Sequence, residues 1–95
     1  MSTAKENILD EAKRLVCGDR QASYGHPWFD FSRTGKMWAA ILGIPFISPE
    51  QVALCMMAVK ISRLCNSMKR DSMVDIAGYA ATLQMVAERR ALLES

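Results

Sequence analysis

Residues 48–65, SPEQVALCMMAVKISRLC, decide the fold predicted for this chain. Ser48 is a good N-cap residue, Pro49 is favoured in the first helical turn, and Gln51 can reach back to the N-cap backbone. The residues that follow are apolar on nearly every side, which is typical of a helix surrounded by other elements. The stretch therefore predicts a helix that begins at Ser48 and lies centrally in an all-α protein.

Two further helices are predicted next to this one. Downstream, a helix begins at Asp71 or Ser72 and continues towards Leu92, with apolar residues at helical spacing. Upstream, a helix begins near Pro27, a favoured first-turn residue, and ends at Gly43.

The first helix is predicted between a capping box formed by Thr3 and Glu6 and a stop at Gly18. No stretch has the alternating pattern of a strand, and no linker divides the chain. Short connections favour antiparallel neighbours. We therefore expect a single domain, residues 1–95, folded as a compact all-α four-helix bundle.

The composition favours an oligomer. Of the 95 residues, 51% are hydrophobic and seven are methionine, which is more apolar surface than one small bundle needs to bury. We therefore expect a homo-oligomer. The formal net charge is only +2 and the basic residues are spread along the chain, which argues against binding to duplex DNA.

The sequence also predicts a location in the cytoplasm. The longest apolar run is interrupted by Gly43 and Pro45, so no stretch reaches the about 18 apolar residues of a membrane span. Three cysteines without a CxxC pair are expected to be reduced and to lie in the core or at an interface. Lys5 and Asp10 are not typical of a signal peptide.

Four residues of the last two helices are candidates for ligand binding. Lys60 and Arg63 interrupt an apolar stretch at a spacing that places them on one helix face, where they can meet a phosphate. Asp75 lies within an apolar segment and needs a partner such as one of these cations. Tyr79 follows one turn later, and Gly78, which costs roughly 1 kcal/mol relative to alanine, indicates a close approach by a helix or ligand. The structural alternatives are that both cations lay their methylene groups on the core and reach water, and that Asp75 forms an ion pair at a tight helix crossing.

The segment between the first two helices, GDRQASYGHPWFDF at residues 18–31, is dense in polar and aromatic residues. Arg20, Tyr24 and His26 are expected to supply a cation and stacking surfaces above the charged cluster. The alternative is that the aromatic residues seal the end of the bundle. His26 is the only histidine and has no cysteines at a zinc-binding spacing, so no metal site is predicted.

Three motifs resemble a domain of unknown function that is common in tailed phages and prophages. They are DRQASYGHPWFDFSRTGKMW, SPEQVALCMMAVKISRL and DSMVDIAGYAATL, in the order that the family has them. The resemblance covers roughly residues 18–86 and implies a phage or prophage protein. The matching residues are Arg20, Tyr24, Gly25, Phe31, Trp38, Lys60, Arg63, Asp75, Gly78 and Tyr79.

That family is in turn distantly similar to the all-α nucleoside triphosphate pyrophosphatases of the MazG type, which are oligomers that hold magnesium with glutamate-rich motifs. Asp75 matches the aspartate of their second motif, but Ser72 stands where they carry glutamate, and their Glu-Glu-x-x-Glu motif has no counterpart. Magnesium catalysis needs several carboxylates. We therefore expect no cofactor, with magnesium only if the protein is a pyrophosphatase.

These observations favour a small phage-type protein that binds a nucleotide or a phosphorylated small molecule without turnover. Such a protein would sequester a nucleotide signal used in host defence. Two alternatives stay open, a divergent magnesium-dependent nucleoside triphosphate pyrophosphatase with a metal site completed across a subunit interface, and a bundle with a purely structural or interaction role. The expected ligand-binding residues are Arg20, Tyr24, His26, Lys60, Arg63, Asp75 and Tyr79.

Overall fold

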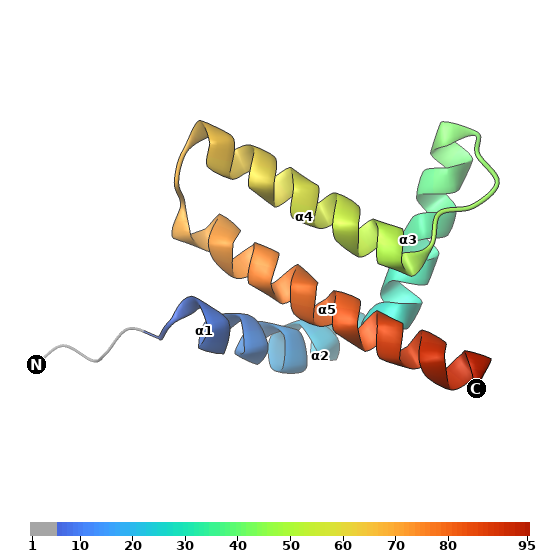
Figure 1. Ribbon diagram of the computed structural model, residues 1–95, viewed down its shortest axis with the longest axis horizontal. Helices are drawn as coiled ribbons and strands as arrows, with labels where there is room; N and C mark the ends of the chain where they lie inside the picture. The colour runs from blue at the N-terminus through green and yellow to red at the C-terminus, as the bar shows by residue number, and fades with distance from the viewer. Residues whose placement is uncertain (1–5) are drawn as a thin grey trace, which may run out of the picture.

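The computed structural model describes residues 6–95, and all regular structure in this range is helical (Figure 1). The elements are α1 (Ile8–Arg14), the π-helix η1 (Leu15–Arg20), α2 (Gln21–Tyr24), α3 (Pro27–Leu42), α4 (Pro49–Asn66) and α5 (Arg70–Glu94). No strand occurs between residues 6 and 95. The all-α prediction is therefore confirmed.

Local signals set the start of α4 as the sequence predicted. The Ser48 hydroxyl accepts a hydrogen bond from the Gln51 backbone N–H at 3.1 Å, and the Gln51 side chain accepts from the Ser48 N–H at 2.8 Å. This reciprocal capping box satisfies two N–H groups that have no partner within the helix. The start of α5 at Arg70 lies within two residues of the predicted start.

The bounds of α3 are also those expected from local chemistry. Pro27 occupies the first turn, and the His26 Nδ1 atom accepts a hydrogen bond from the Trp28 N–H at 3.0 Å. The helix ends at Gly43, whose φ of 68° lies in the left-handed region. A residue with a side chain is strained there, so glycine is a favourable helix end.

The predicted stop at Gly18 is wrong. α1, η1 and α2 form one continuous helical segment, residues 8–24, which we call the α1–α2 segment. Gly18 lies within the π-helix, and the segment ends at Gly25, whose φ is 78°. The first helix is capped by Asn7, which accepts from the Asp10 N–H at 2.9 Å. The predicted Thr3 cap lies outside the described residues.

The central helix is α5, which packs against the α1–α2 segment, α3 and α4. α4 and α5 lie side by side and run in opposite directions, with the α1–α2 segment along another side of α5 (Figure 1). The prediction that the 48–65 helix lies centrally is wrong for a single chain, because among the helices of residues 6–95 α4 packs only against α3 and α5.

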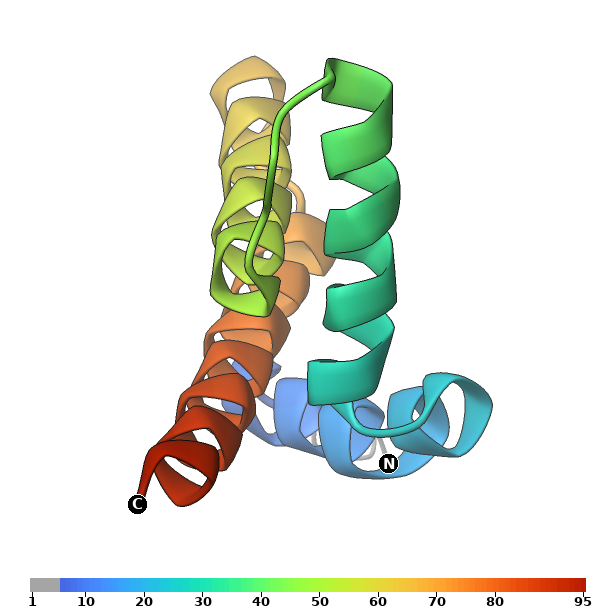
Figure 2. The ribbon, with the colours of Figure 1, turned by 90° about the vertical axis from the view of Figure 1, so that its right-hand side faces the viewer.

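The predicted four-helix bundle is not confirmed. α3 is steeply inclined to the α4–α5 pair in one view (Figure 1) and to the α1–α2 segment in the other (Figure 2). The helices between residues 6 and 95 therefore share no common axis, although the arrangement is all-helical and compact.

The buried core lies where α3, α4 and α5 meet. Phe31 is 2% exposed and packs with Val52, Ala53 and Val86, which are at most 1% exposed. Arg90 of α5 links α5 to α4 at the edge of this core, because it forms a bidentate ion pair with Glu50 at the start of α4. Partly buried residues surround the core: Trp28, Trp38, Ile47, Met56, Tyr79 and Leu83.

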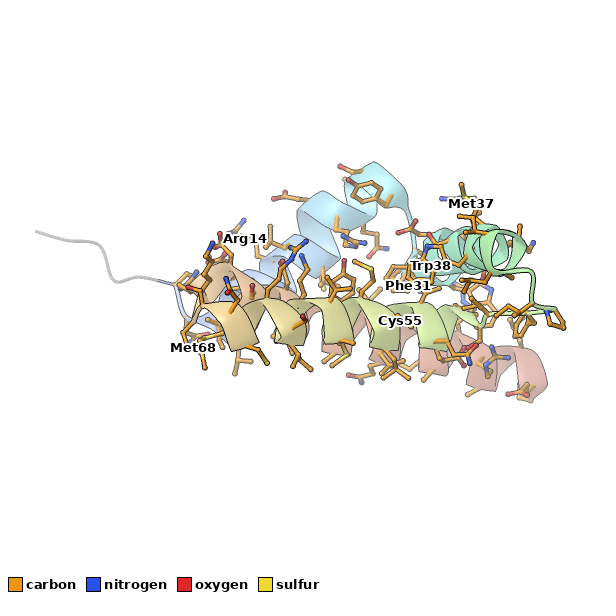
Figure 3. The ribbon with its side chains drawn as sticks, turned by 90° about the horizontal axis from the view of Figure 1, so that it is seen from above. Arg14, Phe31, Met37, Trp38, Cys55 and Met68 are labelled. Carbon is orange, nitrogen blue, oxygen red and sulfur yellow. The ribbon has the colours of Figure 1, made fainter. Side chains whose placement is uncertain are left out.

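Exposed apolar side chains also lie away from this core, and Figure 3 labels two of them. Met37 and Met68 lie at opposite ends of the molecule and are 66% and 78% exposed. Among residues 6–95, no helix is long and apolar enough to cross a membrane.

Candidate functional site

A cavity of about 380 Å³ lies between the α1–α2 segment and α5, and α4 contributes one residue to its wall. We call it the α1–α5 cavity. Its volume falls within the range of small-molecule sites, about 300–1,000 Å³. Five of the seven sequence-predicted site residues line it, namely Arg20, Tyr24, Lys60, Asp75 and Tyr79. The remaining wall consists of Ala12, Leu15, Val16, Asp19, Ser23, Val74, Gly78 and Thr82.

Lys60 and Asp75 form a salt bridge in this wall. The Lys60 Nζ atom lies 3.0 Å from the Asp75 Oδ2 atom, so the ammonium group faces the carboxylate across the α4–α5 contact. The Lys60 side chain is only 13% exposed, whereas the Asp75 side chain is 41% exposed. The carboxylate is therefore the more accessible partner. The expected choice between Lys60 and Arg63 as the partner of Asp75 is thus resolved in favour of Lys60.

Arg20 lies among three aromatic rings. Its guanidinium carbon is 5.1 Å from the centre of the Tyr24 ring, 5.5 Å from that of Tyr79 and 5.8 Å from that of Phe31. These distances are within the range of cation–π attraction. Phe31 and Tyr79 also contact each other, with ring centres 6.3 Å apart. Phe31 belongs to the buried core, so the core beneath the cavity restricts where the Arg20 guanidinium group lies.

The cavity wall carries equal numbers of positive and negative side chains. Arg20 and Lys60 are cations, and Asp19 and Asp75 are carboxylates, so the formal charge of the lining is zero. Arg20 also has a further carboxylate nearby, since its Nη2 atom lies 3.7 Å from the Asp30 Oδ2 atom. The wall therefore offers hydrogen-bond donors and acceptors side by side rather than a strong positive field.

Gly78 has no packing role that would require glycine. A Cβ atom at this position would meet only the Val16 Cγ2 atom at 3.5 Å, which is ordinary van der Waals contact. Gly35 in α3 differs, because a Cβ atom there would lie 2.4 Å from the Ile47 carbonyl oxygen. Glycine inside a helix is destabilising relative to alanine. What Gly78 does provide is space, since it lines the α1–α5 cavity.

The structure separates His26 and Arg63 from the other predicted site residues, because neither lines the cavity. His26 caps α3 through Nδ1 and makes an edge contact with the Phe29 ring, 6.3 Å away between centres. Burial, and secondarily the positive charge of Arg89, hold the pKa of His26 below its ordinary value. The neutral ring is therefore favoured, and it is the form that can accept the Trp28 N–H. Arg63 is exposed one turn beyond Lys60 on α4.

Sequence reasoning missed the wall that the α1–α2 segment contributes. Asp19 and Ser23 supply a carboxylate and a hydroxyl to the cavity, and Leu15 and Val16 supply apolar surface. Asp19 and Arg20 belong to the π-helix, a form that occurs frequently at functional sites. The helical spacing of Leu15, Asp19 and Ser23 was a signal that could have found this face, had the helix been extended beyond Gly18.

Among residues 6–95, no three histidine, cysteine, aspartate or glutamate side chains lie close enough together to hold a metal ion. Asp75 and Asp19 are the carboxylates in the cavity wall, and Asp75 is paired with Lys60. These residues do not fit the carboxylate cluster that magnesium catalysis requires. We therefore derive no metal-dependent step from this chain.

Comparisons with known proteins indicate a phage family. Residues 7–87 match a family described as a domain of unknown function, DUF6378. The chain is 38% identical over 84 residues to the Gene 55 protein of Mycobacterium phage D29, which covers 87% of this chain and 55% of that protein. It is also 38% identical over 80 residues to the Gene 55 protein of Mycobacterium phage L5, covering 82% and 51%. The chain thus spans about half the length of these curated relatives. No solved structure matches it.

Proposed function

The chain belongs to DUF6378, a family of phage domains of unknown function, and from its cavity we propose that it binds a nucleotide or another phosphorylated small molecule. The observation that carries the proposal is the composition of the cavity wall. Residues distant in the sequence contribute a guanidinium group, an ammonium group, two carboxylates and two tyrosine rings to one space of about 380 Å³. Nucleotides present rings that stack on tyrosine and oxygen atoms that accept from arginine and lysine.

Each side chain has a role in this proposal. Arg20, fixed by its aromatic neighbours, would present its fork to a phosphate group. Tyr24, which is 56% exposed, would supply a stacking surface. Lys60 and Asp75 would contact polar atoms at the other end of the ligand, and they also hold each other in position.

We propose that the ligand is bound without turnover, as suits a phage protein that sequesters a nucleotide signal used in host defence. The protein would act in the host cytoplasm, where its three exposed cysteines, which form no disulfide, stay reduced. A divergent pyrophosphatase of the MazG type is the alternative function. It would need carboxylates from a partner subunit to complete a magnesium site around Asp75.

The outer face of α4 supports the proposal of a homo-oligomer. This α4 outer face consists of Leu54, Ala58, Ile61 and Cys65, which share one side of the helix and are all exposed. Leu54 and Ile61 are each 51% exposed. Within residues 6–95 no other helix lies in front of α4 in the view onto it (Figure 3). Because the face carries no charge, it can pair with the same face of a second copy.

The binding proposal is tested by native mass spectrometry of the purified protein followed by titration with nucleotides. Lys60→Ala should weaken binding by about 1.5–3 kcal/mol, the value of a hydrogen bond to a charged group. Arg63→Ala is the matched control, because Arg63 is a cation on the same helix that does not line the cavity. If the two variants bind equally well, the cavity is not the binding site. If both bind as the wild type while Lys60→Ala loses stability, the charges are purely structural.

The turnover proposal is tested by incubating a bound nucleoside triphosphate with magnesium at stoichiometric protein and then analysing it by chromatography. We expect the intact triphosphate to be recovered. Conversion to the monophosphate that is abolished by Asp75→Ala would establish the pyrophosphatase instead.

The oligomer proposal is tested by light scattering at micromolar concentration. Ile61→Glu should reduce the mass of the assembly, since it places a charge in the middle of the α4 outer face. Met68→Glu is the control, because Met68 is 78% exposed but lies beyond α4. A monomeric wild-type protein would rule out the oligomer.

A further inference from the structure

Resting on the function proposed above, we infer that the α1–α5 cavity is selective for guanine, and that Lys60 and Asp75 read the edge of the base. The inference starts from the geometry of this pair. The Lys60 ammonium group is a donor, and it lies 3.0 Å from one oxygen of an accessible carboxylate. This contact is to the Oδ2 atom of Asp75, and the Asp75 side chain is 41% exposed. The wall therefore presents one donor followed by the two acceptor oxygens of a carboxylate.

Guanine is the base whose edge complements this order. Its O6 atom is an acceptor, and next to it lie two donors, the N1–H and the 2-amino group. Lys60 would donate to O6, and the two oxygens of Asp75 would accept from N1–H and from the 2-amino group. Adenine and cytosine present a single amino donor beside an acceptor, so one carboxylate oxygen would be left without a partner. A bound base would cover this carboxylate, and a polar atom that a ligand covers without pairing loses its contact with water, at a cost of about 1–3 kcal/mol when it is fully covered.

The rest of the wall suits a flat ring beside this pair. Leu15, Val16 and Val74 give the cavity an apolar surface, and Gly78 leaves space next to Asp75 and Tyr79. A purine ring against such surfaces gains both apolar contact and stacking on tyrosine. The helices that carry Lys60 and Asp75 are packed together, so the two side chains that would contact the base lie on rigid helices rather than on a loop.

The charge of the cavity wall limits how many phosphate groups the ligand carries. Two cations and two carboxylates line the cavity, so it offers no excess of positive charge to a chain of phosphates. Arg20 provides one guanidinium group, which can donate two parallel hydrogen bonds to one phosphate group. The wall therefore favours guanosine or its 5′-monophosphate over the triphosphate, which would bind more weakly.

The first experiment uses the wild-type protein alone. Isothermal titration compares guanosine, inosine and adenosine 5′-monophosphates, where the inosine compound differs from the guanosine compound only by lacking the 2-amino group. We expect inosine monophosphate to bind about tenfold or more weakly, which is the loss of one hydrogen bond to a charged acceptor. Equal affinity for all three would overturn the guanine inference and leave the proposed function standing. No binding of any nucleotide would overturn both.

The second experiment assigns the recognition to Asp75. Asp75→Asn removes one of the two acceptors, so the ratio of guanosine to inosine monophosphate affinity should fall towards one. Asp19→Asn is the matched control, because Asp19 is the other carboxylate in the wall and has no role in reading the base. The far-ultraviolet circular dichroism of each variant shows whether it is folded. If Asp75→Asn does not fold, the titration of the wild-type protein with the three monophosphates decides the inference. A ratio unchanged in folded Asp75→Asn, or lost equally in Asp19→Asn, would refute the assignment.

Discussion

Replacing Gly78 by alanine should stabilise the free protein and weaken ligand binding. Alanine is more favourable than glycine in a helix interior by about 0.8–1.0 kcal/mol. The added methyl group would meet only the Val16 Cγ2 atom, at an ordinary contact distance of 3.5 Å, so no strain opposes this gain. For a domain of this size, about 1 kcal/mol raises the melting temperature by roughly 4–8 °C. Thermal and urea denaturation followed by circular dichroism measure the gain.

The same substitution should lower the affinity for guanosine monophosphate. Gly78 lines the cavity, so the methyl group takes space that the proposed ligand fills. Forcing a methyl group into a filled site costs about 1–3 kcal/mol, so isothermal titration should show binding weakened by about tenfold. A more stable protein with unchanged affinity would show that the ligand does not occupy this part of the cavity. A less stable protein would show that helix packing requires the glycine.

Gly35→Ala is the matched control. It brings the same gain in helix propensity, but its Cβ atom would lie 2.4 Å from the Ile47 carbonyl oxygen, and the backbone before α4 must shift to make room. We therefore expect Gly35→Ala to lower stability, opposite in sign to Gly78→Ala. A gain in stability from both substitutions would contradict this prediction, because it would mean that the 43–48 connection moves away from Gly35 at little cost.

Three further predictions concern the stability of the fold. Because burial lowers the pKa of His26 below its ordinary value of 6.5, the unfolded chain binds the proton more tightly, and stability should fall as the pH drops below 6.5. Urea denaturation between about pH 7 and about pH 5 should show this loss in the wild type and less of it in His26→Asn, which keeps a capping side chain; equal slopes would contradict it. Phe31→Ala should lower the free energy of unfolding by about 3–5 kcal/mol, because Phe31 is 2% exposed in the main core; a loss under about 1 kcal/mol would mean that the core repacks. Ser48→Ala should cost about 1 kcal/mol by removing one half of the capping box at α4, and an unchanged denaturation midpoint would disprove that role.

Much of the helical pattern could be predicted because it depends on neighbouring residues. Pro27 and Gly43 bound α3, and Ser48 with Gln51 begins α4, and each signal acts within one turn of the chain. Gly18 was misread because a glycine can be tolerated within a helix or end one, and the difference lies in backbone angles that the sequence does not display. The helix continues past Gly18 as a π-helix over Leu15–Arg20.

The candidate site could be predicted only in part, because it depends on which helices pack together. Helical spacing correctly grouped Asp75 with Tyr79, but it also grouped Lys60 with Arg63, and of these two only Lys60 lines the cavity. Similarly, an apolar pattern on all sides predicted that α4 is buried, whereas in one chain it leaves Leu54 and Ile61 exposed. A sequence pattern shows that a surface is apolar without showing whether the same chain or a second copy covers it.

The placement of the aromatic residues gives the protein separate optical reporters. Both tyrosines of the chain, Tyr24 and Tyr79, line the cavity, whereas both tryptophans, Trp28 and Trp38, lie on α3 outside its wall. Tyrosine difference absorption should therefore follow a molecule entering the cavity, while tryptophan emission should follow the packing of α3 against the core. Tryptophan emission thus monitors the α3 region without a label, from residues that do not line the cavity.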